Sequence, residues 1–131
     1  MNKSIVLEKK MSMIPFILIA VVLAVTGQLF VKKGLNVLGT MDFSSGIFMA
    51  YLQVYKSPLV LIGTFIYLLS ILFWIYALSK VELSFAYPFL ALSYVLVILA
   101  SWLILGEKIP FLRWLGLIVI CIGVFIISRS Y

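Results

Sequence analysis

The chain has 131 residues, of which 66% are hydrophobic and 11% are charged, and its formal net charge is +6. Soluble domains keep about a quarter of their residues charged, so this composition excludes an ordinary water-soluble fold and indicates a membrane protein. The charged residues lie in short zones beside long apolar runs, so the basic excess indicates contact with a membrane surface and not with nucleic acid.

Four apolar runs are each long enough to cross a bilayer. They cover residues 11–31, 58–79, 83–105 and 111–128. About 20 helical residues at 1.5 Å rise span a hydrocarbon core of about 30 Å. The sequence therefore predicts an all-α membrane protein with one domain, residues 1–131, and four transmembrane helices. The first run follows a basic segment as a secretory signal would, but its length and its lack of a small-residue cleavage site favour a retained helix.

A polar cluster ends the first span. Gln28 and Lys32 are four residues apart and share a helix face, and Lys33 lies beside them. An amide without a partner in hydrocarbon is costly, so Gln28 is expected to face protein, water or a ligand. An amide below two ammonium groups suits an anionic headgroup. The alternative is that both lysines only anchor the span by reaching to the membrane surface.

The longest connection, residues 32–56, joins the first two spans. Aromatic and aliphatic residues recur in it at spacings of three to four between positions 43 and 55. This pattern predicts a short helix lying in the membrane interface.

Aromatic and hydroxyl side chains follow one face of the second span and one of the third. The candidate substrate-binding residues there are Tyr67, Trp74, Tyr87, Ser93 and Tyr94. Such faces stack on sugar rings or cations and bond their substituents, although tyrosine and tryptophan near span ends also serve purely as membrane anchors. Ser93 lies off the main stripe. Pro88 removes a backbone hydrogen bond from the third span and predicts a kink with carbonyl groups free to meet a ligand.

The basic residues do not define an orientation. The side holding both termini and the middle loop has Lys3, Lys9, Lys10, Lys80 and Arg129, whereas the other has Lys32, Lys33, Lys56, Lys108 and Arg113. An equal count is typical of a protein that inserts in both orientations or pairs with an oppositely inserted partner. The alternative is that the N-terminal lysines alone place the N-terminus inside.

The chain is expected to dimerise, because one four-helix unit is too thin to enclose a polar path. An antiparallel dimer supplies the inverted symmetry that larger transporters contain in one chain. Gly116 and Gly123 are seven residues apart and keep two small positions on one seam of the fourth span. We therefore predict that this span forms the dimer seam.

Enzymatic chemistry has few candidates in this sequence. Cys121 is the single cysteine, the chain has no histidine, and no acidic residue lies inside the four apolar runs. The sequence thus supports neither a disulfide nor a metal site, and general acid–base catalysis is unsupported. We expect no cofactor, no metal and no enzymatic activity, and an intramembrane carboxylate for proton coupling is missing.

Three segments resemble the drug/metabolite transporter superfamily, which includes the EamA-like and small multidrug resistance proteins. They are Ala24–Lys33 (AVTGQLFVKK), Phe85–Ser93 (FAYPFLALS) and Leu105–Ile127 (LGEKIPFLRWLGLIVICIGVFII). The Gly-Gln pair in the first span, together with Ala-Tyr-Pro in the third, is similar to the small subunits that flip aminoarabinose-phosphoundecaprenol across the bacterial inner membrane. In small multidrug resistance exporters a glutamate stands where this chain has Ala24, which argues against proton-driven export by their mechanism.

The resemblance implies a flippase for a polyprenyl-phosphate-linked sugar or a related anionic lipid, in the bacterial inner membrane. It also implies a homodimer, or a heterodimer with a similar small subunit. Lys32 and Lys33 would meet the phosphate, and Gln28 and the aromatic residues would line the path of the sugar. Two alternatives remain: an exporter of cationic drugs or metabolites, and an accessory membrane subunit that transports nothing itself.

Overall fold

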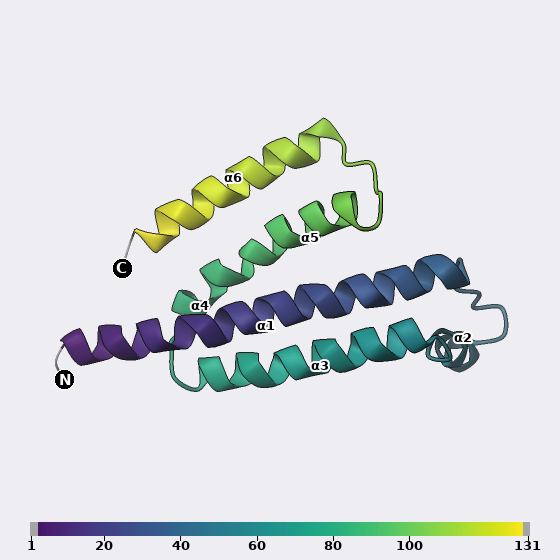
Figure 1. The fold of residues 1–131 in the computed structure, drawn as a ribbon, viewed down its shortest axis with the longest axis horizontal. Helices are drawn as coiled ribbons and strands as arrows, with labels where there is room; N and C mark the ends of the chain where they lie inside the picture. The colour runs from purple at the N-terminus through teal and green to yellow at the C-terminus, as the bar shows by residue number, and fades with distance from the viewer. Residues whose placement is uncertain (1–2, 130–131) are drawn as a thin grey trace.

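The computed structural model describes residues 3–129, which form six α-helices (Figure 1). In chain order they are α1 (Lys3–Leu38), α2 (Ile47–Val54), α3 (Pro58–Leu78), α4 (Leu83–Leu90), α5 (Leu92–Leu103) and α6 (Phe111–Ser128). The chain in this range is all-helical, as the sequence predicts. The short helix α2 lies within the segment 43–55 for which an interfacial helix is predicted, and it begins directly after Gly46.

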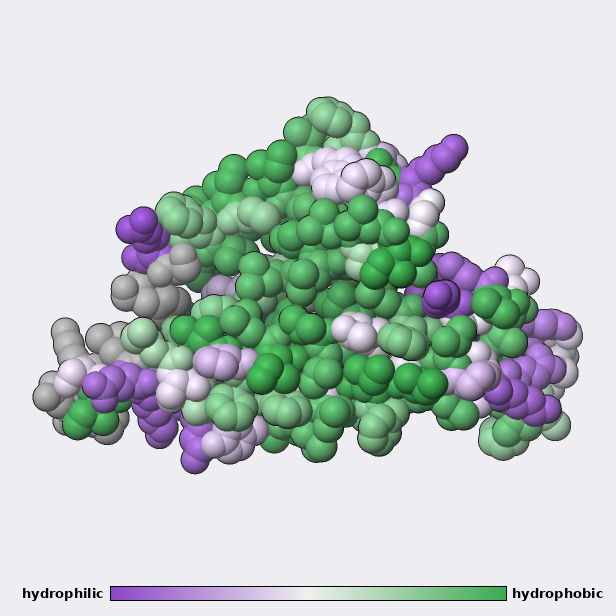
Figure 2. All heavy atoms as spheres, viewed as in Figure 1, coloured by the Kyte–Doolittle hydropathy of each residue, from purple (hydrophilic) through white to green (hydrophobic). Residues whose placement is uncertain are grey.

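Three helical segments are long and apolar enough to cross a membrane: Ser4–Leu38, Pro58–Leu78 and Leu83–Leu103. A shorter apolar helix covers Phe111–Ile127. Figure 2 shows hydrophobic side chains over the middle of the molecule and hydrophilic ones gathered at its two ends. Such a band between polar ends is the surface that a bilayer requires, so the chain is a multi-pass membrane protein.

The first helix is longer than the predicted span of residues 11–31. At 36 residues, α1 measures about 54 Å and extends beyond a hydrocarbon core of about 30 Å. It ends at Gly39, whose φ of 85° continues the chain out of the helix while its N–H donates to the Leu35 carbonyl at 2.9 Å. Near the other end, Lys10 forms an ion pair of 3.5 Å with Glu82, which ties α1 to the loop before α4.

A close backbone contact joins α1 to α3, and these two helices run side by side (Figure 1). A Cβ built on Gly27 would lie 2.6 Å from the Gly63 carbonyl oxygen, and one built on Gly63 would lie 2.6 Å from the Gly27 carbonyl oxygen. Any side chain at either position would therefore push the helices apart. Small residues let membrane helices approach closely enough for extensive van der Waals contact, which drives their association.

Apolar packing continues at the end of the bundle near the N-terminus. A buried cluster there joins α1, α3 and α4 and consists of Met13, Ile17, Ala77, Val81 and Ala86. Ile17 and Ala77 are fully buried. Only a short loop joins α3 to α4 at this cluster, so the third apolar segment begins in contact with α1. Its second half, α5, contacts α1.

The sequence predicts a kink at Pro88. The third apolar segment is interrupted three residues later, at Ala91. The Tyr94 N–H, which would bond the Leu90 carbonyl in an unbroken helix, donates instead to the Ala91 carbonyl at 3.1 Å. The Ser93 hydroxyl donates to the Leu90 carbonyl in its place. The break is thus closed locally, and Ser93 stabilises it.

The last helix, α6, lies outermost in the bundle (Figure 1). Its Trp114 packs edge-on against Trp102 of α5, with ring centroids 5.9 Å apart. A Cβ built on Gly116 or Gly123 would meet nothing within 4 Å in the described chain. Both glycines of the predicted dimer seam therefore lie on a surface that the chain itself leaves uncovered.

Candidate functional site

A groove of about 310 Å³ lies between α1, α5 and the loop that follows α5. Its polar lining residues are Gln28 and Lys32 from α1, Ser101 from α5 and Glu107 from the loop. Apolar side chains complete the wall: Val25, Leu29, Val97 and Leu105. The volume is at the lower end of the range of small-ligand sites, about 300 to 1,000 Å³. The structure thus brings two predicted site residues, Gln28 and Lys32, into one groove.

Two neighbouring faces of α1 have different contacts, one with α3 and one with the groove. Gly27 and Val31, one turn apart, contact α3. Gln28 and Lys32 follow them by one residue, which turns their side chains about 100° around the helix and toward α5. One face of α1 therefore holds the fold together while the next face forms the groove.

Local backbone geometry holds Glu107 at the groove. Gly106 has a φ of 67°, a left-handed conformation that glycine adopts without strain, and it turns the chain out of α5. The Glu107 N–H then donates to the Ser101 carbonyl at 3.0 Å. This bond fixes the loop against the end of α5, so Ser101 and Glu107 reach the groove together.

Two other predicted residues lie at the same depth as the groove but do not line it. Lys33 is exposed beside Lys32 at the same end of α1. Tyr67 packs its Cβ against Gly27 on the α1–α3 contact, and 40% of the residue remains exposed. Lys33 thus adds charge beside Lys32, whereas Tyr67 belongs to the contact between α1 and α3.

The remaining predicted residues lie nearer the other end of the bundle. Trp74 and Tyr87 contact each other edge-on, with ring centroids 6.1 Å apart, and Trp74 also packs against the buried cluster around Ile17. Ile17 and Gln28 are eleven residues apart on α1, which corresponds to about 16 Å along the helix. Tyr94 is 59% exposed beside the break in the third segment. The predicted set is therefore divided between a groove and a separate aromatic pair.

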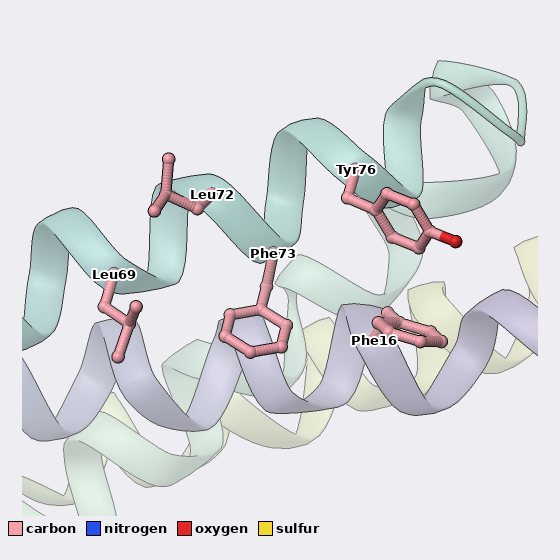
Figure 3. Close-up of a pocket in the computed structure, with 5 residues that line it drawn as sticks. All are labelled: Phe16, Leu69, Leu72, Phe73 and Tyr76. Atoms are coloured by element: carbon pink, nitrogen blue, oxygen red, sulfur yellow. The ribbon is translucent and has the colours of Figure 1, made fainter.

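An apolar hollow of about 280 Å³ lies between α1 and α3 at the depth of the aromatic pair. Figure 3 shows that Leu69, Leu72, Phe73 and Tyr76 reach it from α3 and that Phe16 reaches it from α1. The Phe16 and Tyr76 rings are 5.1 Å apart. With a single phenol hydroxyl in its lining, this hollow suits hydrocarbon and offers little to a charged headgroup.

The connection between α1 and α2 holds a perturbed carboxylate away from the groove. Asp42 accepts hydrogen bonds from the backbone N–H of Ser44 at 2.8 Å and from its hydroxyl at 2.9 Å. These bonds, the backbone one first, lower the pKa of Asp42 below its ordinary value. The ionised Asp42 thus stabilises the turn that leads into α2.

Ser101 and Glu107 are not among the site residues that the sequence predicts. The signal that identifies them is topology: the first and third spans run in the same direction, so their C-terminal ends meet at one membrane surface. Gln28 and Lys32 end the first span, and Ser101 and Glu107 end the third. Their similar depth follows from helix direction, whereas their place in one groove follows from the packing of α5 against α1.

Comparison with known proteins agrees with this architecture. The model of the EamA-like transporter family matches residues 10–129, which include all of the groove residues. The chain belongs to the EamA-like transporter family. No solved structure was found to match it.

Comparison with individual proteins gives more specific similarities than the family model. The chain is 36% identical over 115 residues to a protein of Serratia proteamaculans named probable 4-amino-4-deoxy-L-arabinose-phosphoundecaprenol flippase subunit ArnF, a match covering 85% of this chain and 88% of that one. It is 37% identical over 117 residues to the protein of that name in Photorhabdus laumondii, covering 86% and 93%. The ArnE subunit of Yersinia pestis is 42% identical over 60 residues, covering 46% and 53%.

Proposed function

We propose that this chain is a small subunit of a flippase that moves a polyprenyl-phosphate-linked sugar between the leaflets of a bacterial inner membrane. The observation behind the proposal is the similarity, along most of both chains, to two proteins named as aminoarabinose-phosphoundecaprenol flippase subunits. The cargo we assign is of the same class: an undecaprenyl-type phosphate bearing an aminopentose. The protein acts as a transporter and not as an enzyme.

The groove between α1 and α5 is the proposed headgroup site. Lys32 meets the phosphate, because an ammonium group at the membrane surface forms charge-assisted hydrogen bonds with phosphate oxygens. Lys33 adds positive charge at the same surface. Gln28 and Ser101 bond the sugar hydroxyls one turn deeper. A hydrocarbon chain leaves the groove past its apolar wall and stays among the lipids.

The aromatic residues form the proposed continuation of the path. Tyr67 lies at the depth of Gly27, and Trp74 and Tyr87 lie further along, by the cluster around Ile17. Ser93 and Tyr94 lie near the break at Ala91. A sugar that crosses the membrane needs stacking surfaces and hydroxyl groups at successive depths, since hydrocarbon offers neither. The break at Ala91 separates α4 from α5, so the two helices can present their side chains at different angles to the headgroup.

The assembly that we propose is a dimer with four spans in each subunit. In it α6 serves as the fourth span, and the uncovered surface around Gly116 and Gly123 packs on a partner. The partner is a second copy of the chain or a similar small subunit, and the equal charge on the two sides permits an antiparallel arrangement.

Transfer between leaflets tests the proposal. The chain, with any subunit that remains bound to it, is reconstituted into vesicles containing aminoarabinose-phosphoundecaprenol, and a membrane-impermeant amine reagent reports the outer-leaflet lipid. We expect the wild type to move the lipid and Gln28→Ala to move it at least about ten-fold more slowly, because the variant leaves the headgroup without its amide partner. Gln53→Ala removes an exposed amide outside the groove and is the matched control. Unaltered transfer in Gln28→Ala would contradict the proposed site.

A further inference from the structure

The groove contains charges of both signs that are not joined in an ion pair. Lys32 and Glu107 both line it, yet within residues 3–129 neither side chain takes part in an ion pair at 4.0 Å or less. An unpaired carboxylate beside a phosphate site would repel the phosphate, so Glu107 is unfavourable for binding an anion alone. Its position calls for a positive group on the ligand.

Each wall of the groove has an apolar residue at one end and a charged residue at the other. Along α1 the lining begins at Val25 and ends at Lys32, with Gln28 and Leu29 between them. Along α5 and its loop it begins at Val97 and ends at Glu107, with Ser101 and Leu105 between them. The two charged residues therefore stand opposite each other at the polar end, and hydrocarbon-like walls lie below them. A ligand with an apolar tail and two opposite charges on its headgroup matches this order.

We propose that Glu107 is a specificity-determining residue that binds a primary ammonium group on the sugar, while Lys32 binds the phosphate. The site then selects a zwitterionic headgroup over one that has only the phosphate. This inference rests on the proposed function and adds the residue that recognises the amino group. The carboxylate and the ammonium form a charge-assisted hydrogen bond, which is about twice as strong as a neutral one.

The other carboxylates with described side chains have different surroundings. Glu82 pairs with Lys10 at the opposite end of the bundle. Asp42 accepts both hydrogen bonds from Ser44 in the loop before α2. Glu8 is exposed in the first turns of α1. Glu107 is the carboxylate that lines the groove with Lys32, and its loop is fixed to α5 by the bond to the Ser101 carbonyl.

The test compares two lipids that differ only at the amino group. Vesicles containing the reconstituted protein are loaded either with aminoarabinose-phosphoundecaprenol or with its N-acetyl derivative, which has no positive charge. Periodate added from outside cleaves the C2–C3 diol that both sugars contain, and the intact lipid that remains is measured by mass spectrometry. Because the free amine allows a second cleavage in the amino lipid alone, each lipid's loss is normalised to its own loss in detergent-opened vesicles. The variants are Glu107→Gln, which keeps the shape of the side chain and removes its charge, and Glu82→Gln, which makes the same change outside the groove.

We expect the wild type and Glu82→Gln to transfer the amino lipid at least about ten-fold faster than the N-acetyl lipid. Glu107→Gln should reduce this ratio to about one, mainly by slowing the amino lipid. The wild-type ratio requires no variant, so the proposal remains testable if Glu107→Gln does not fold. Equal transfer of both lipids by the wild type, or a ratio that survives Glu107→Gln, would overturn the role of Glu107 alone. Failure of the wild type to move either lipid would overturn the proposed function and this inference with it.

Discussion

Replacing Gly27 with alanine would place one methyl group against the backbone of α3. The added carbon lies 2.6 Å from the Gly63 carbonyl oxygen and 2.8 Å from the Tyr67 nitrogen, whereas ordinary contacts begin at 3.4 Å. The helices must therefore separate by about 0.8 Å, the difference between 3.4 and 2.6 Å. Overpacking of this kind costs about 1–3 kcal/mol.

Alanine also stabilises a helix relative to glycine by about 1 kcal/mol, which partly offsets the clash. Gly123→Ala provides the control, because it adds the same methyl group inside a helix where nothing described lies within 4 Å. The difference between the two variants then isolates the clash, and we expect Gly27→Ala to be less stable than Gly123→Ala by about 1–3 kcal/mol.

Unfolding of the monomeric chain in detergent with increasing dodecyl sulfate, followed by circular dichroism, measures this difference. Equal stability of Gly27→Ala and Gly123→Ala would show that α1 and α3 do not meet at Gly27 and Gly63. The groove would then be misplaced as well, because the contact with α3 determines which face of α1 turns toward α5.

Three further predictions concern charges and rings. Lys32→Gln should slow lipid transfer about ten-fold or more, and Lys33→Gln should slow it less, because Lys32 alone of the pair lines the groove; equal losses in the vesicle assay would contradict this assignment. Trp74→Leu should slow transfer without changing the affinity for a soluble headgroup analogue, since Trp74 packs on the cluster around Ile17 and does not line the groove. Weaker binding of the analogue would place Trp74 in the headgroup site instead. Ser44→Ala should raise the pKa of Asp42 only part of the way to its ordinary value, because the stronger backbone bond remains. Since the pKa of Asp42 is lowered in the folded chain, ionised Asp42 stabilises the turn above the ordinary pKa of aspartate, and this stability is lost as pH falls through the lowered value. A carboxyl NMR titration of both proteins measures the pKa.

Hydropathy alone predicts most of the fold. The apolar runs at 58–79 and 83–105 correspond closely to α3 and to α4 with α5, because the lengths of such segments are set by the bilayer. The first run, 11–31, covers only part of α1. The helix α1 continues through charged residues at both ends, where hydropathy falls but hydrogen bonding within the helix persists.

The site was predictable in part, for a physical reason. Gln28 and Lys32 stand out because polar groups in or near hydrocarbon require partners. Ser101 and Glu107 do not stand out, since a serine can bond its own helix and a loop carboxylate can simply meet water. Only the packing of α5 against α1 brings them to the groove, and a single sequence does not specify which helices are neighbours. The close contact of Gly27 with Gly63 depends on the same missing information.

The central claim is that the headgroup of a lipid-linked sugar binds between α1 and α5. Photocrosslinking tests it most directly, with an undecaprenyl-phosphate aminosugar that bears a small diazirine on the sugar and with mass spectrometry to locate the attachment. We predict attachment within residues 25–32 and 97–107, lost on competition with the unmodified lipid and reduced in Lys32→Gln. Attachment spread evenly over the lipid-facing surface, or confined to the hollow around Phe16 and Tyr76, would contradict the account.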